Sequence, residues 1–276
     1  MRRHSPPGQP PGPGSPRTAN LATHMAVLGN KGTAMPEMLF YRRPETLRPQ
    51  VHMGLRFAPL TSYTFAKEAK SVPLLAFEFI DACRTYPIVF SRGANESFQA
   101  HAILSLAEGG NTFIDEQGQW TTSYIPSYIR RYPFVLASLP DRNEFAVAFD
   151  ADSGCFGTVE GNALYDESGA SSAFLEKEID FLRKLHHEHL RTEQLLKMLM
   201  AESLLSTVKV DLVRGGEQEK SSLGRFVAID EDKLKKLPAD KATKFLTDGV
   251  LALCYAQLIS LKNFEALARR EREEAA

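Results

Sequence analysis

The sequence has few cysteines, no long apolar run and almost no net charge. Cys83, Cys155 and Cys254 form no CxxC pair, so the common zinc-knuckle and dithiol motifs are excluded and a reducing compartment is favoured. No window approaches the ~20 apolar residues of a transmembrane helix, and we expect no membrane span. Thirty-three basic and thirty-four acidic residues give a net charge of -1. This balance excludes a strong positive electrostatic field that would attract polyanions. Nucleic acid is not an expected partner.

The motifs of the common enzyme classes are also missing. The chain contains no GxSxG nucleophile elbow, no GxGxxG and no GxxxxGK[ST] phosphate loop, which lowers the expectation of hydrolase or nucleotide chemistry. We therefore expect no cofactor and favour a non-catalytic protein, although catalysis stays open.

The first forty residues differ in composition from the rest. Six of the 16 prolines fall within residues 1–16, a composition that buries too little apolar surface to fold. We predict a disordered tail over residues 1–40 and a single domain over residues 41–273. The nearby apolar segment MAVLG is shorter than the hydrophobic region of a signal peptide, so we expect a cytoplasmic protein.

Hydrophobic patterns in the domain predict an α+β fold. A helix capped by Ser71 is expected over residues 72–85, and short apolar segments predict strands at 86–90, 101–109, 111–115, 134–139 and 145–150. We expect a mostly antiparallel sheet in this half. After Ser171 the apolar positions repeat every three or four residues, which predicts a long amphipathic helix. A late hairpin and a closing helical segment from Asp240, interrupted at Gly249, complete the pattern.

The segment SYIPSYIRRYPF, residues 123–134, is the strongest candidate for a binding surface. Pro126 and Pro133 predict a short helix between two stops. One helical turn apart, Tyr124 and Tyr128 share a face, and Arg131 follows three residues after Tyr128. Stacked aromatic and guanidinium groups are typical of protein contacts. The alternative is a corner helix whose tyrosines pack on the sheet. The candidate binding residues are Trp120, Tyr124, Tyr128, Arg130 and Arg131.

An apolar strand that ends in Asp150 and Asp152 is a candidate for a divalent-metal site. Such a pair is typical of metal-assisted hydrolases and phosphotransferases, but the downstream lysine and second acidic cluster of that chemistry are not evident. The alternative is a β-turn whose polar side chains bond nearby amides.

A second candidate metal site lies in the sequence HHEH. His186 and His189 are one helical turn apart, with Glu193 a further turn along. However, His189 falls on the line from Leu182 to Leu196, the predicted buried stripe. The alternative is therefore a core or half-buried histidine.

Several sequence blocks together resemble the bacterial SapC family, named for association with the surface layer. They include VPLLAFEF, YPIVF, GNTFIDEQGQWTTSYIPSYIRRYPF, DADSG and LYDESG, and the similarity covers roughly residues 45–265. The resemblance implies an accessory role in cell-surface or nutrient-uptake systems and supplies no catalytic residues. We accordingly expect a protein partner. Association with the cell surface is the alternative to the cytoplasm, and the oligomeric state is left open.

Overall fold

The computed structural model describes residues 38–93, 97–106, 109–139, 144–214 and 219–274. The predicted tail lies outside the described residues except for its last three positions. Phe40, one of these, is buried, and its ring meets Phe65 and Tyr128 edge-on. The described domain therefore includes the end of the segment predicted to be disordered.

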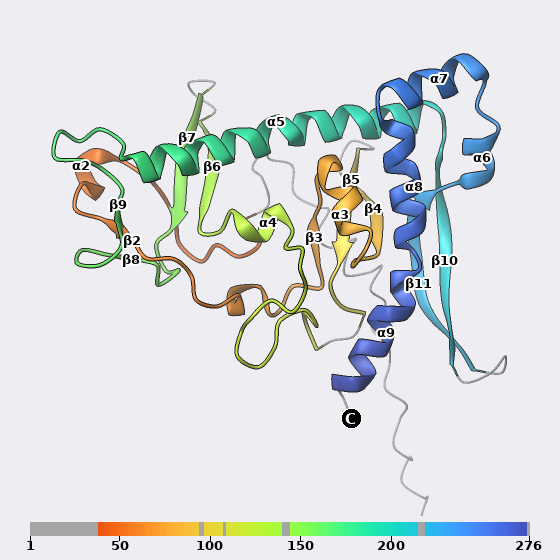
Figure 1. The fold of residues 1–276 in the computed structure, drawn as a ribbon, viewed down its shortest axis with the longest axis horizontal. Helices are drawn as coiled ribbons and strands as arrows, with labels where there is room; N and C mark the ends of the chain where they lie inside the picture. Colours follow the sequence, from red (N-terminus) through yellow and green to blue (C-terminus); the bar gives the residue numbers. More distant parts are fainter. Residues whose placement is uncertain (1–37, 94–96, 107–108, 140–143, 215–218, 275–276) are drawn as a thin grey trace, which may run out of the picture.

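Short strands precede one long helix, a hairpin and a helical C-terminal region (Figure 1). The strands are β1 (Pro44–Thr46), β2 (Arg56–Phe57), β3 (Ser71–Pro73), β4 (Ile88–Arg92), β5 (Phe98–Ile103), β6 (Phe134–Leu139), β7 (Glu144–Asp150), β8 (Phe156–Gly157), β9 (Asn162–Ala163), β10 (Leu205–Arg214) and β11 (Glu219–Ile229). The helices are α2 (Pro49–His52), η1 (Thr64–Ala66), η2 (Ala76–Glu78), α3 (Phe79–Ala82), α4 (Ser127–Arg130), α5 (Ala173–Ala201), α6 (Glu231–Lys235), α7 (Ala239–Thr247), α8 (Val250–Ser260) and α9 (Asn263–Glu274).

These strands form three antiparallel sheets. The largest has the order β10-β11-β4-β5-β3, and the two smaller sheets have the orders β1-β7-β6 and β8-β2-β9. The fold is α+β, as the sequence pattern predicted. The late hairpin β10–β11 is not separate from the earlier strands, because β11 pairs with β4 and extends the same sheet.

The long helix α5 connects two hydrophobic cores. Its first turns place Leu175 and Leu182 in the smaller core under β6 and β7, whereas Leu195, Leu196 and Leu199 belong to the larger core. In Figure 1 the helix runs along the top of the molecule from α2 and β9 to α8. Ser172 caps it by accepting a hydrogen bond from the Leu175 amide at 3.2 Å, which satisfies one of the free donors of the first turn.

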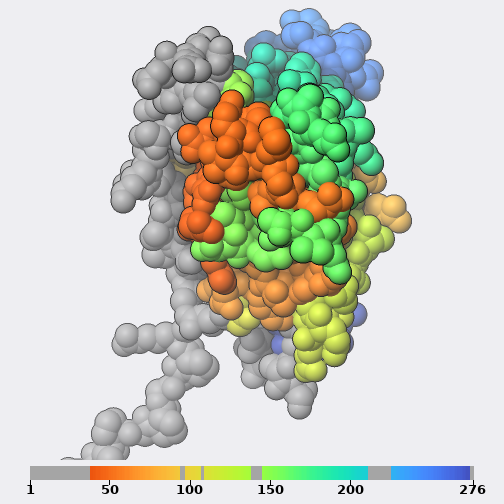
Figure 2. Space-filling view, turned by 90° about the vertical axis from the view of Figure 1, so that its left-hand side faces the viewer, coloured from red at the N-terminus to blue at the C-terminus, as the bar shows by residue number. Residues whose placement is uncertain are grey.

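The end of the molecule opposite the hairpin is built from distant parts of the chain. Figure 2 shows residues near position 50 beside residues 150–170. Here β2 pairs with both β8 and β9. Gly161 lies against β2 with a φ of 97°, and a Cβ at this position would be 2.2 Å from the Phe57 carbonyl oxygen. A glycine is therefore needed for this close backbone approach.

Helix α8 is attached to the large sheet by buried polar side chains. The β4–β11 ladder consists of the single pair Phe90 and Val227. Beside it, the Gln257 amide donates to the Ile88 carbonyl at 2.9 Å and accepts from the Ile229 amide at 3.1 Å. These bonds satisfy backbone groups that strand pairing leaves open. They fix the inner face of α8 to both strands.

The segment before α3 differs from the sequence prediction. Residues 71–73 form strand β3, paired with β5, and helical structure begins only at Ala76. The helix predicted from Ser71 is therefore wrong over its first turn. The pairing with β5, rather than an alternating burial pattern, defines this strand, since Ser71 and Val72 are both buried. The strand predicted at 111–115 is reduced to an isolated bridge between Ile114 and Trp120.

Helix α8 is unusually apolar, whereas α9 carries many charged residues. Residues Val250–Glu273, which comprise α8 and most of α9, are long and apolar enough to cross a membrane. A helix in the core of a soluble protein passes the same two criteria, and Val250, Cys254 and Gln257 are buried in the domain. The absence of a membrane span stays a prediction.

Candidate functional site

The predicted short helix in SYIPSYIRRYPF is present as α4. It begins after Pro126 and its last turn ends at Arg131, in agreement with the two proline stops. Tyr128 and Ile129 are buried, so the helix packs inward. The segment is a corner of the fold with an inner and an outer side.

A buried carboxylate, Glu78, fixes this corner. It has no exposed surface and accepts hydrogen bonds from the Leu75 amide, the Ser127 amide, the Ser127 hydroxyl and the Tyr124 hydroxyl, at 2.7–2.9 Å. Burial raises the pKa of Tyr124 above its ordinary value, and the nearby Glu78 carboxylate raises it further. Tyr124 is thus a hydrogen-bond donor to the fold.

The predicted stacking of an arginine on a tyrosine is confirmed. The Arg131 guanidinium carbon lies 3.9 Å from the centre of the Tyr128 ring, in the range of a strong cation–π contact. Tyr128 is only 7% exposed, however, and Arg131 is partly buried. This pair lies inside the corner.

Arg130 is the exposed member of the predicted binding residues. Its Nε donates to the Ile125 carbonyl at 3.0 Å, and its guanidinium lies 6.0 Å from the Tyr124 ring and 5.9 Å from the Phe181 ring. These contacts hold an outward guanidinium in place. Trp120, by contrast, is partly buried, and its Nε1 lies 3.0 Å from the Tyr86 hydroxyl.

Asp150 and Asp152 have different surroundings at the end of β7. Asp150 is fully buried and accepts hydrogen bonds from the Arg43 amide at 2.8 Å, the Asp152 amide at 3.3 Å and the Tyr132 hydroxyl at 2.7 Å. Burial alone would raise the pKa of Asp150, but these donors outweigh it and the pKa lies below its usual value. Asp152 is exposed and pairs with Arg43 at 2.8 Å. Both carboxylates hold β1 beside β7.

The two candidate histidines lie on the outer half of α5. The His186 ring packs 4.4 Å from the Phe145 ring, and His189 lies 3.4 Å from the Glu193 carboxylate. The predicted stripe is correct for Leu182 and Leu196, but His189 between them is exposed. This part of α5 passes from one core to the other.

The candidate metal residues do not converge. Across the part of the chain that the structure describes, which includes all four of them, no group of three or more His, Cys, Asp or Glu side chains is arranged to hold a metal ion. The geometry gives the metal-assisted alternative no support.

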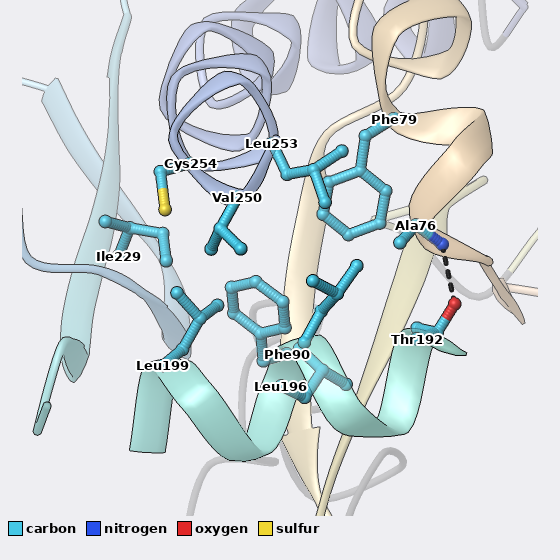
Figure 3. A pocket seen from close by; sticks show the side chains of 11 residues that line it. Ala76, Phe79, Phe90, Thr192, Leu196, Leu199, Ile229, Val250, Leu253 and Cys254 are labelled. Carbon is cyan, nitrogen blue, oxygen red and sulfur yellow. Dashed lines mark hydrogen bonds between the residues drawn. The ribbon is translucent and has the colours of Figure 1, made fainter. Parts of the chain in front are cut away.

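Figure 3 shows a small cavity between α5, α8, η2 and β4. Its volume is about 10 Å³, close to the minimum for a single water molecule. Apart from Thr192, all of its lining side chains are apolar, and the Thr192 hydroxyl already accepts from the Ala76 amide and donates to the Glu188 carbonyl. The cavity is a packing gap of the large core.

An exposed apolar surface lies on the outer side of η2, α3 and α8. Phe77 and Ile80 are 43% and 54% exposed, and Tyr255 and Ile259 on α8 are 41% and 58% exposed. We call these four residues the α3–α8 face. Sequence reasoning missed it, although α8 is uncharged over its whole length, VLALCYAQLIS. A helix that is apolar on all sides is normally covered on all sides.

The two helices that carry this face are adjacent. Phe79 of α3 and Leu253 of α8 line the same cavity, and the Asn263 side chain donates to the Cys83 carbonyl at 2.7 Å. Both ends of α3 therefore contact the α8 region, and Figure 1 shows α3 beside α8.

Comparison with known proteins identifies one relationship. The SapC family model matches residues 47–267, which spans every described element from α2 to the first turns of α9. No curated protein and no solved structure matches the sequence. Because the match covers most of the chain, this protein belongs to the SapC family.

Proposed function

We propose that the protein is a non-catalytic accessory protein that acts in the cytoplasm by binding another protein of a cell-surface or nutrient-uptake system. The observation that carries the proposal is the α3–α8 face. Large apolar side chains that stand exposed together are typical of protein-binding surfaces. On this face, Ile80 and Ile259 are each more than half exposed.

Two of the predicted binding residues, Tyr124 and Arg130, are linked to the segment that carries Phe77. Phe77 directly precedes Glu78, whose carboxylate accepts from the Tyr124 hydroxyl, and Arg130 lies beside the Tyr124 ring. Tyrosine and arginine are enriched where binding energy is concentrated. Tyr124 and Arg130 are thus connected through Glu78 to the segment that carries Phe77, whereas Tyr128 and Arg131 support the corner from inside.

Affinity capture from the producing cells tests the proposal. The tagged protein is compared with the double variant Ile80→Glu/Ile259→Glu and with the control Val51→Glu/Val159→Glu. The control positions are 63% and 84% exposed and lie outside the face. We expect one or a few proteins to be retained by wild type and by the control and lost from the face variant. Identical protein lists from all three chains would refute the proposal.

A further inference from the structure

Residues 38–46, which we call the strap, cross the corner around α4 and end in β1. Phe40 is the anchor of the strap. It is 9% exposed, and its ring lies edge-on against the rings of Phe65 and Tyr128. A single aromatic side chain thus fixes the start of the strap to aromatic rings of the corner.

The backbone of the strap is held as a bound peptide is held. The Arg43 amide donates to the Asp150 carboxylate at 2.8 Å, and the Ala151 amide donates to the Arg43 carbonyl at 2.9 Å. Pro44–Thr46 then pair antiparallel with β7, from Asp150 to Ala148. An aromatic anchor followed by a strand added to a sheet edge is the arrangement of peptide recognition by strand addition.

The strap and the residues that receive it fall on different sides of the family boundary. The SapC family model begins at residue 47. It therefore includes Phe65, Tyr128 and β7, which we call the strap site, and none of the strap itself. The strap site belongs to the region that defines the family, and its occupant lies before that region.

The strap is built like a segment that opens locally. Of its nine residues, only Phe40 is buried. Within the described part of the chain, β1 is a three-residue edge strand whose one neighbour is β7, in the order β1-β7-β6. Segments with few buried side chains open at a lower free energy than the core does. Opening would leave the edge of β7 available to another strand.

We propose that the strap is an intramolecular ligand that blocks a peptide-binding site. When the strap opens, the strap site takes an extended segment of a partner protein with an aromatic residue four positions before a strand, as Phe40 precedes Pro44. The closed strap lowers the apparent affinity for this partner by the fraction of molecules that are closed. The inference goes beyond the proposed function, because it concerns residues outside the α3–α8 face.

A second copy of this chain is a weaker competitor for the strap site. Its strap has the same sequence and would make the same contacts. However, the strap of the same chain acts at an effective concentration on the order of millimolar, so it outcompetes a second copy at micromolar protein. A partner segment that fits the site better than the strap is therefore the occupant that displaces it.

Hydrogen exchange of the full-length chain, followed by mass spectrometry, tests whether the strap opens by itself. The Arg43 amide is bonded to Asp150 and the Leu47 amide to the Val147 carbonyl. We expect these two amides to exchange at least about tenfold faster than the slowest amides of β6. Equal rates would show that the strap opens only when the whole domain unfolds, and the inference would then be wrong.

A labelled peptide with the sequence of residues 38–47, MLFYRRPETL, tests the site on the full-length protein by fluorescence anisotropy. Phe40→Ala removes the anchor of the strap, so this variant should bind the peptide at least about tenfold more tightly than wild type. Leu39→Ala is the matched control, because Leu39 is 38% exposed, and it should bind as wild type does. A peptide that carries the Phe40→Ala change itself should bind at least about tenfold more weakly.

Thermal melts check that each variant is folded. If Phe40→Ala is unfolded, Tyr41→Phe replaces it, since this change removes only the hydroxyl that donates to the Phe134 carbonyl. Tyr41→Phe should raise the affinity for the peptide about threefold.

Two results of these measurements would overturn the inference. One is equal affinity of the peptide for wild type and both strap variants, or binding to none of them, which would make the strap a fixed part of the fold. The other is a dimer mass for wild type by light scattering that becomes a monomer mass in Phe40→Ala. That result would assign the strap site to a second copy of this chain.

Discussion

Single buried polar residues decide how the corner around α4 is built. Glu78 is fully buried, yet four hydrogen-bond donors surround its carboxylate. A buried charge is tolerated only when it is paired in this way. Glu78 joins η2 to the segment 124–127, and so it fixes the segment that carries Phe77.

Loss of this carboxylate should be strongly destabilising. We expect Glu78→Ala to lower the free energy of unfolding by about 3–5 kcal/mol, because it leaves buried donors without an acceptor. The exposed Glu116 is the matched control, and Glu116→Ala should change stability by less than about 0.5 kcal/mol. Urea unfolding followed by circular dichroism measures both. Equal effects would show that Glu78 has no special role.

His101 is expected to make the stability of the fold depend on pH. It is 3% exposed, its Nε2 lies 2.9 Å from the Ser91 hydroxyl, and its Nδ1 has no hydrogen-bond partner in the described structure. Burial lowers the pKa of His101 from 6.5 to about 4. Between these values the unfolded chain binds a proton that the folded chain does not. The free energy of unfolding should therefore fall as pH decreases from 6.5 to 4, by up to about 3 kcal/mol.

The variant His101→Gln tests this expectation, because it lacks the titrating ring. Its stability should depend less on pH across this window than that of wild type, while the exposed-site control His187→Gln should keep the wild-type slope. The measurement is the midpoint of urea unfolding at several pH values. An unchanged slope in His101→Gln would exclude His101 as the cause.

At the scale of elements, patterns along the chain predicted those parts of the fold that local periodicity determines. The strands β4, β6 and β7, the helix α5 and the hairpin β10–β11 lie where the apolar periods indicated. The stacking of Arg131 on Tyr128 also follows from spacing alone.

Contacts between distant segments account for the rest. β3 replaces the start of a predicted helix because it pairs with β5, some thirty residues away, and tertiary pairing overrides local propensity. Glu78 accepts from Ser127 across 49 positions, a partner that no local pattern reveals. A single acidic residue in the apolar run VPLLAFEFI was nevertheless a signal of a buried, paired carboxylate.

The contact of Gly161 with β2 gives a prediction for the small sheet β8-β2-β9. Gly161 and Gly154 both have positive φ, but only Gly161 faces a backbone oxygen, whereas Gly154 has open space around it. Gly154→Ala should cost about 1 kcal/mol for the backbone conformation alone. Gly161→Ala should cost roughly 2 kcal/mol more, because the steric clash adds to it. Thermal or urea unfolding of the two variants compares them, and equal losses would contradict the assigned contact.

For the whole molecule, α5 is the element that joins the two cores. Leu182 lies in the smaller core and Leu196 in the larger one. Because both cores share α5, unfolding of the helix in one core would also disturb the other core. We expect one cooperative unfolding transition. In differential scanning calorimetry the van't Hoff and calorimetric enthalpies should agree. Two resolved peaks would show that the cores are independent domains.

The interior and the surface of the molecule differ in what their side chains do. Asp150, Tyr124 and Glu78 are engaged in hydrogen bonds within the fold, whereas Ile80 and Ile259 point outward beside basic residues. The proposed binding function therefore belongs to the outside of α3 and α8.

Photo-cross-linking in the producing cells tests that claim most directly. A benzophenone side chain is introduced at position 259 in one chain and at position 159 in another, since Ile259 and Val159 are both exposed but only Ile259 belongs to the face. The account predicts a discrete adduct with another protein from position 259 and none from position 159. The same adducts from both positions, or adducts from position 159 alone, would contradict it.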